Sequence, residues 1–268
     1  MVDPWGYLAR DMADEHAAII QYLQHAWRVG EETGCALEEI ARDEMRHLNW
    51  LAEAMAEAGQ PVRLERSPVA QGEGGIADLL ALDVAAEEGA IAAYREQILA
   101  LGPEHPLTPL LERILADEEH HREEFRRLAE AAGEEAVAVG EPSEGAPWDG
   151  LAHEKYRRVL RYLQLAFTAA DPALGREMEE QAQVQMRHLG WAGEEWTRSA
   201  GRAVIAPEDP PPAPTPDQLA QEAFAIPPEA GELGRLMEIH DAFARRRIGT
   251  FTSPWSVGSL KPKSATPG

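Results

Sequence analysis

Four long helical segments, joined by a short, a long and a short connection, constrain the fold of this sequence most strongly. Aspartate followed by proline predicts a helix start at Asp3-Pro4, and glycine predicts a helix end at Gly102. By the same signals, the expected helices span residues 4–29, 36–58, 76–101 and 108–132. Each would be about 35–40 Å long, because an α-helix rises about 1.5 Å per residue. Short links make antiparallel neighbours and a long link can cross a bundle, so we expect a four-helix bundle over 1–135 with one long crossover.

The rest of the chain predicts more helices and therefore an all-α fold. Glycine, proline and acidic residues dominate one connecting stretch, and a run of prolines indicates a second, extended one. The expected division is the bundle over 1–135, a linker over 136–150, a helical hairpin over 151–200, a proline-rich linker over 201–215, a C-terminal helix over 216–252 and a flexible tail over 253–268.

The hairpin over 151–200 repeats part of the first hairpin. The sequence Tyr-Leu-Gln at 22–24 recurs at 162–164, and Met-Arg-His-Leu at 45–48 recurs at 186–189, which gives offsets of 140 and 141. Where the first copy has Glu44, the second has Gln185. We therefore expect a degenerate structural copy, in which His188 packs or forms hydrogen bonds. A vestigial metal site of His153, Glu154 and His188 is an alternative.

Two Glu-x-x-His motifs carry the predicted chemistry. Residues three apart share one face of a helix, so each motif can present both side chains to one metal. A lone glutamate stands near the middle of each of the other two helices, with Glu88 as an alternative to Glu87. The six candidate metal ligands are Glu15, Glu44, His47, Glu87, Glu118 and His121.

The neighbours of these ligands on each helix face are apolar, which predicts that the glutamates are buried. Buried carboxylates cost several kcal/mol each without compensation, and two of them about 4 Å apart repel by roughly 4 kcal/mol. Four negative charges balance two divalent cations. Oxygen and imidazole ligands without sulfur favour iron, with manganese as an alternative.

Two further pairs of side chains have predicted roles beside the metals. Asp43 and Asp117 each precede a Glu-x-x-His motif, and each is expected to accept a hydrogen bond from the metal-bound histidine of the opposite helix. Tyr22 and Tyr94 follow the lone glutamates by seven residues and are candidate catalytic donors of protons or electrons.

The charge of the chain excludes some partners. A net charge of −22 disfavours nucleic acid and anionic membranes, and it suits a protein that attracts cations. The single cysteine, Cys35, excludes a disulfide framework within the chain. The acidic N-terminus does not resemble a signal peptide, and no long apolar run predicts a membrane span. We expect a soluble, cytoplasmic protein that forms a homo-oligomer, most simply a dimer.

About half of the chain, 11–58 and 76–128, resembles the ferritin-like superfamily, particularly bacterioferritins and rubrerythrins. The resemblance rests on EHAAIIQY at 15–22, DEMRH at 43–47 and LADEEHH at 115–121; DEMRH is also similar to a motif of bacterial multicomponent monooxygenases. It implies a di-iron site in which Glu44 and Glu118 bridge the metals and the other four ligands are terminal.

The sequence also departs from these families. It has no cysteine-rich electron-transfer domain of the rubrerythrin kind, and the long second half would interfere with the hollow shell of storage ferritins. Met45 stands where bacterioferritin has a haem ligand, although a methionine in such a place is more often a packing residue.

Three functions remain open from the sequence. The first is a di-iron oxidoreductase that activates O₂ or peroxide, with or without a small organic substrate. The second is a ferroxidase or iron-handling protein, for which Fe(II) is the substrate. The third is a helical scaffold that binds a partner protein, which the complete set of ligands disfavours.

Overall fold

A computed structural model of the chain describes residues 3–29, 31–132, 148–169 and 171–208. The chain divides into two units, Met1–Phe224 and Ala225–Gly268, and all described residues belong to the first. The described helices are α1 (Pro4–Ala26), α2 (Glu31–Glu57), α3 (Ile76–Leu101), α4 (Thr108–Ala132), α5 (Asp149–Thr168) and α6 (Pro172–Ala200). The described part is all-α, as predicted. The expected C-terminal helix and tail lie outside the described residues.

Local signals in the sequence set the ends of these helices. The side chain of Asp3 accepts a hydrogen bond from the backbone N–H of Gly6 at 3.1 Å, and Asp171 caps α6 in the same way through Ala173 at 2.9 Å. A proline occupies the first turn of both helices, where its missing N–H costs nothing. α3 ends at Gly102, whose φ of 82° favours glycine.

The start of α2 differs from the prediction. We expected this helix to begin at residue 36, but it begins at Glu31, so Gly34 lies inside it. A Cβ atom at this position would lie 2.9 Å from the carbonyl oxygen of Ala26, at the end of α1. The glycine therefore permits a close approach of the two helices and does not interrupt α2.

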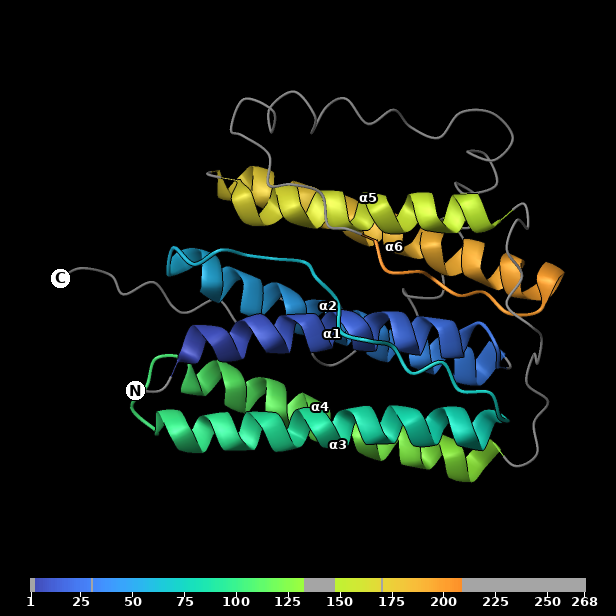
Figure 1. The fold of residues 1–268 in the computed structure, drawn as a ribbon, viewed down its shortest axis with the longest axis horizontal. Coiled ribbons are helices and arrows are strands. Elements are labelled where there is room, and N and C mark those ends of the chain that lie inside the picture. Colours follow the sequence, from blue (N-terminus) through green and yellow to red (C-terminus); the bar gives the residue numbers. More distant parts are fainter. Residues whose placement is uncertain (1–2, 30, 133–147, 170, 209–268) are drawn as a thin grey trace. The chain divides into compact units, whose positions relative to one another are not determined.

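The first four helices form the expected bundle (Figure 1). α1 and α2 make one antiparallel hairpin, α3 and α4 make another, and the connection from α2 to α3 runs along the bundle. Arg28, at the end of α1, holds this crossover by donating to the carbonyl oxygens of Gln71 and Gly72 at 3.0 and 2.8 Å. Buried aliphatic side chains from all four helices, such as Leu8, Leu51, Leu79 and Ile114, form the core.

The third hairpin, α5–α6, packs on α1–α2. Tyr156 on α5 is hydrogen-bonded to His16 on α1, and Asn49 on α2 donates to Glu179 on α6 at 2.7 Å. A Cβ atom at Gly193 would lie within 2.2 Å of the ring of Trp27, so glycine lets α6 approach the end of α1. α1–α2 is consequently covered by α3–α4 through one face and by α5–α6 through another.

Candidate metal centre

The six candidate ligands come together in the middle of the first bundle. α1 contributes Glu15, α2 contributes Glu44 and His47, α3 contributes Glu87, and α4 contributes Glu118 and His121. None of these residues is more than 4 % exposed. Glu88, the alternative to Glu87, instead faces outward and pairs with Arg126 at 2.7 Å. Glu87, and not Glu88, therefore lies among the candidate ligands in the structure.

The ligand atoms form two groups that share two glutamates. The first group is Glu15, Glu44, His47 and Glu118; the second is Glu44, Glu87, Glu118 and His121. Within each group, the candidate ligand atoms all lie within 4.8 Å of one another, so each could hold a metal ion. Since Glu44 and Glu118 belong to both groups, their carboxylates lie where they could contact two ions.

Both histidines direct Nδ1 toward the carboxylates. Nδ1 of His47 lies 2.9 Å from Oε2 of Glu44 and 2.9 Å from Oε1 of Glu118. Nδ1 of His121 lies 2.9 Å from Oε1 of Glu44 and 4.0 Å from Oε1 of Glu87. Each imidazole thus presents one nitrogen to the place where the carboxylate oxygens converge.

The other nitrogen of each histidine faces an aspartate on the opposite helix. Nε2 of His47 on α2 lies 3.5 Å from Oδ2 of Asp117 on α4, and Nε2 of His121 on α4 lies 3.5 Å from Oδ2 of Asp43 on α2. An acceptor at this place fixes the orientation of the ring and leaves Nδ1 for a metal. The two aspartates face the histidines of the opposite helices, but Nε2 of His47 and Oδ2 of Asp117 are not joined by a hydrogen bond at this distance, so the expected hydrogen bonds stay a prediction.

The two tyrosines are hydrogen-bonded to the lone glutamates in a crosswise pattern. The hydroxyl of Tyr22 on α1 donates to Oε1 of Glu87 on α3 at 2.6 Å, and Tyr94 on α3 donates to Glu15 on α1. Both tyrosines are almost completely buried. Burial, together with the neighbouring carboxylates, raises the pKa of both hydroxyls well above the usual value, so they stay protonated as donors.

The carboxylates change the protonation of the histidines. Burial alone would lower the pKa of His121, but Glu44 and the other carboxylates raise it to about 10. The pKa of His47 is also well above its usual range, because the opposing effect of burial is outweighed by Glu118 and its neighbours. In the absence of metal, the carboxylates therefore favour the positively charged form of both imidazoles.

The glutamates respond in two different ways. Burial and then the charge of Glu118 raise the pKa of Glu15 and of Glu87 well above the usual value. Burial alone would also raise the pKa of Glu44, but the two protonated histidines hold it well below the usual value. Protons thus neutralise part of the negative charge that metal ions could neutralise instead.

The arrangement passes a direct test of whether it fits a metal. Oε2 of Glu87 is buried without a hydrogen-bond partner, and a buried polar atom is costly when unpaired. Oε1 of Glu44 and Oε1 of Glu118 each have a histidine Nδ1 at 2.9 Å, but neither contact has the alignment of a hydrogen bond. A cation in contact with these atoms would satisfy them together. A donor set of carboxylate oxygens and imidazole nitrogens suits iron or manganese.

The structure adds a polar ladder along α1 and α3 that the sequence did not reveal. Beyond the metal groups, Gln97 donates to Asp11 at 2.8 Å, and His25 lies 2.8 Å from Asp83, which also accepts from Gln21 at 2.9 Å. Burial raises the pKa of Asp11 to about 7. A second internal repeat could have revealed the ladder, because Asp83, Glu87, Tyr94 and Gln97 each follow Asp11, Glu15, Tyr22 and His25 by 72 positions.

The third hairpin, α5–α6, lacks the buried glutamates of the first hairpin, α1–α2. Lys155 is fully buried and donates to Gln185 at 3.3 Å, at the positions that correspond to Glu15 and Glu44. His153 contacts Asp149 and the backbone N–H of Ala206. Within the described residues, only the two groups in the first bundle could hold a metal, so the vestigial site is absent there.

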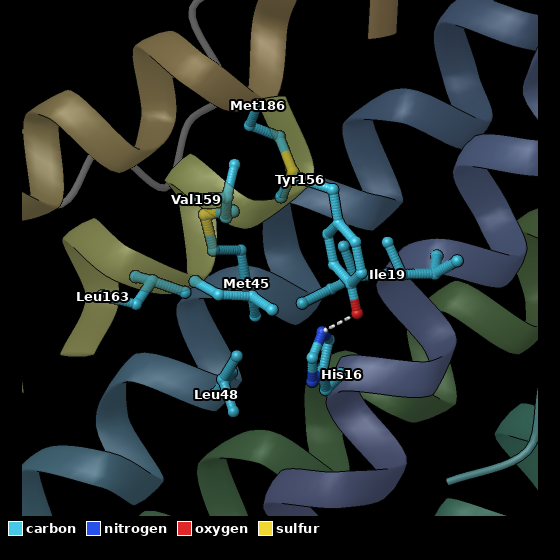
Figure 2. A pocket seen from close by; sticks show the side chains of 10 residues that line it. His16, Ile19, Met45, Leu48, Tyr156, Val159, Leu163 and Met186 are labelled. Atoms are coloured by element: carbon cyan, nitrogen blue, oxygen red, sulfur yellow. Dashed lines mark hydrogen bonds between the residues drawn. The ribbon is translucent and has the colours of Figure 1, made fainter. Parts of the chain in front are cut away.

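Met45 lies outside the metal groups, between the first and third hairpins. It lines a cavity of about 10 Å³ with His16, Leu48, Tyr156, Val159 and Met186. Figure 2 shows the hydrogen bond between Tyr156 and His16 at one side of this cavity. A space of this size holds about one water molecule. It does not accommodate a haem, and Met45 therefore serves as a packing residue.

The fold and the centre define a class of protein, the four-helix bundles that carry a cluster of glutamates and histidines in their core. Residues 6–133 match the family model described as Ferritin-like domain, and this part of the chain belongs to the ferritin-like superfamily, as predicted. Comparisons with curated proteins and with solved structures gave no significant match. Among the described helices, none is long and apolar enough to cross a membrane.

Proposed function

We propose that this protein is a ferritin-like di-iron oxidoreductase that uses O₂ or peroxide as its oxidant. The observation that carries the proposal is the sharing of Glu44 and Glu118 between the two potential metal groups. Two glutamates common to both groups suit a pair of ions that are close enough to act together. When bound, two iron ions would supply the electrons that reduce the oxidant.

The charges of the centre support two divalent ions. Four glutamates supply four negative charges when they are ionised, and two divalent cations balance them while both histidines bind in the neutral form. A single ion would leave excess negative charge in a buried place, which is costly. Raised pKa values favour protons on His47, His121, Glu15 and Glu87 in the metal-free protein, and such protons would leave as the ions enter.

The tyrosines support redox chemistry at this centre. Tyr22 and Tyr94 each hold a proton on a hydroxyl that is bonded to a glutamate of the centre. They are placed to orient Glu87 and Glu15 and to supply a proton to that side of the centre. Each tyrosine can also give up an electron with its proton, so we assign both a catalytic role.

A ferroxidase, for which Fe(II) is the substrate, is the second candidate. Asp43 is 38 % exposed and Asp117 is 19 % exposed at the side chain, and each lies 3.5 Å from a histidine of the centre. These carboxylates would attract Fe(II) beside the buried ligands, and the net charge of −22 favours cation uptake in the same way.

An anaerobic titration with Fe(II), followed by air and absorption spectroscopy, tests the proposal. We expect saturation near two irons per chain and a di-ferric absorption band in a small oligomer, as judged by light scattering of the same sample. Glu87→Gln is expected to weaken the uptake of one iron. The matched control is Glu88→Gln, which changes an exposed side chain of the same helix and should bind iron like the wild type.

The possible outcomes separate the candidates. Uptake of very many irons by a large particle would favour iron storage over the oxidoreductase. If neither Fe(II) nor Mn(II) binds in stoichiometric amounts, the metal centre is refuted. If Glu88→Gln has the same effect as Glu87→Gln, the ligand assignment on α3 is wrong.

A further inference from the structure

Trp50 lies between the solvent and a ligand of the metal centre. It follows His47 by three residues on α2, so the two side chains share one face of the helix. The two ring centroids are 5.8 Å apart, with an angle of 39° between the ring planes. His47 is completely buried, whereas Trp50 is half-buried. The indole therefore connects the buried imidazole with the surface.

Two charged residues, Arg46 and Asp43, lie between Trp50 and His121, the second histidine of the centre. The guanidinium of Arg46 lies 5.8 Å from the centre of the Trp50 ring and is paired with Asp43 at 2.8 Å. Asp43 in turn faces Nε2 of His121 at 3.5 Å. The rings of His47 and His121 are stacked, with centroids 5.7 Å apart. The Trp50 patch, defined as Asp43, Arg46 and Trp50, thus lies next to both imidazoles of the centre.

We propose that Trp50 is a redox relay that passes single electrons from an external one-electron reductant to the metal centre. The inference rests on the proposed oxidoreductase function, since it requires an oxidised centre. Once peroxide has taken electrons from the centre, Trp50 would return one electron through His47 and lose its indole N–H proton to solvent. The reductant then returns one electron and solvent returns one proton, which restores the indole.

The environment of Trp50 explains why the proton must leave with the electron. The positive charge of Arg46 disfavours a second positive charge on the adjacent indole. A neutral indole radical avoids that repulsion, and a half-buried indole can exchange its proton with water. The external donor is a small or protein-borne one-electron carrier, because it has to reach the indole edge at the surface and not the buried metals.

The chain contains a matched control for this role. Trp191 on α6 stands 141 positions after Trp50 in the repeated hairpin, and it is also half-buried. Its ring packs edge-on against Trp148 with centroids 5.3 Å apart, in a hairpin that has no metal group among the described residues. Trp191 therefore shares the helical position and exposure of Trp50 without a metal centre beside it.

The experiment compares Trp50→Phe, Trp50→Tyr and Trp191→Phe in the full-length, Fe(II)-loaded protein. Each is mixed with H₂O₂, without and with ascorbate as the one-electron reductant. We expect an indole radical by electron paramagnetic resonance and oxidised Trp50 by peptide mass spectrometry in the wild type, both suppressed by ascorbate. Trp50→Phe should slow ascorbate oxidation by about tenfold or more. Trp50→Tyr, which keeps a redox-active ring, should restore part of that rate, and Trp191→Phe should match the wild type.

The outcomes distinguish this inference from the proposed function. If all variants oxidise iron normally and Trp50→Phe oxidises ascorbate within twofold of the wild-type rate, the relay is refuted and the di-iron function stands. Equal loss in Trp50→Phe and Trp50→Tyr would mean that the indole only packs, which also refutes the relay. If the wild type neither binds two irons nor oxidises them, the proposed function fails and the relay fails with it.

Discussion

The first hairpin, α1–α2, and its copy, α5–α6, show what separates a hairpin with candidate metal ligands from one without them. Both carry the same Tyr-Leu-Gln and Met-Arg-His-Leu sequences, and Met45 and Met186 line the same small cavity between them. The difference lies on another face of the helices. There, the first hairpin has Glu15 and Glu44, whereas the copy has Lys155 and Gln185.

The comparison teaches that the buried carboxylates are not needed to build a hairpin of this kind. The copy also has Leu151 where the first hairpin has Asp11, so an apolar side chain replaces a buried acid. An apolar replacement is usually neutral or stabilising, since burying a charge is costly. The acidic residues of the first hairpin are therefore best explained by the centre that they form.

The largest effect, on the affinity for Fe(II), is expected when Glu44 of the first hairpin is replaced by glutamine, the residue at the corresponding position of the copy. Glu44→Gln removes the charge of a ligand that belongs to both metal groups, so both ions should be lost. We expect the affinity for Fe(II) to fall by more than about 100-fold, which exceeds the loss typical of an outer partner. Isothermal titration under anaerobic conditions measures the change.

The reciprocal change is the control for this prediction. Gln185→Glu gives the copy a glutamate, but the described residues form no further group of candidate ligands around it, so the number of irons bound should not change. A gain of iron in Gln185→Glu, or normal binding in Glu44→Gln, would contradict the division of roles between the two hairpins.

A smaller effect is expected on the free energy of unfolding of the metal-free protein, which should depend on pH. The pKa of His121 is about 10 in the folded state and 6.5 in the unfolded state, so the folded state binds the proton more tightly. The resulting stability is present below pH 6.5 and is lost as the pH rises through 10. At about 1.4 kcal/mol per pKa unit, this amounts to several kcal/mol.

Urea unfolding at several pH values, with EDTA and with bound metal, measures this effect. Metal binding needs the neutral imidazole, so the metal-loaded protein should not lose stability over the same range. If stability depends on pH in the same way with and without metal, protons and metal ions do not compete for the imidazole of His121.

Ionisation of Asp11 should also lower the stability of the metal-free protein as the pH rises, by a smaller amount. Its pKa is about 7 in the folded state against 3.8 in the unfolded state, so stability falls as the pH rises from about 4 to 7. Asp11→Asn keeps an acceptor for Gln97 and removes the titration. At pH 8 and without metal, it should raise the free energy of unfolding by roughly 2–4 kcal/mol. At pH 4, the variant and the wild type should unfold at the same urea concentration; a constant difference would refute the role of ionisation.

The smallest effect on stability is expected at the contact between the first hairpin, α1–α2, and its copy, α5–α6. Tyr156→Phe removes the hydrogen bond to His16 at 2.9 Å while it keeps the ring in the cavity wall. The loss should be about 1 kcal/mol, the usual net contribution of such a bond. Thermal unfolding measures it, and the stoichiometry of Fe(II) binding should stay unchanged. A loss of iron binding would mean that the copy supports the metal centre as well as the fold.

Much of the fold and the centre could be predicted because the signals are local. The caps at Asp3 and Asp171 and the stop at Gly102 depend on a few neighbouring residues. The Glu-x-x-His spacing likewise depends only on helix geometry. Six residues that lie together and buried in the structure could therefore be named as candidate ligands before their contacts were known.

What could not be predicted depends on how separate helices meet. Gly34 was expected to lie before α2, because the close approach of Ala26 that explains it is a tertiary contact. The pairing of Asp83 with His25 also depends on the register between α1 and α3. A glutamate near the metals can be recognised by its motif, but a buried aspartate four residues away carries no motif of its own.

The crosswise pairing at the centre has a consequence for how the protein is made. Each metal group draws ligands from three helices, and each histidine needs an aspartate from the opposite hairpin. During synthesis, α1 and α2 leave the ribosome before α4 exists, so the emerging first hairpin lacks Glu118 and His121. Under the proposed function, iron loading would then follow the docking of α1–α2 with α3–α4, and a chain that stalls before residue 121 cannot assemble both groups of candidate ligands.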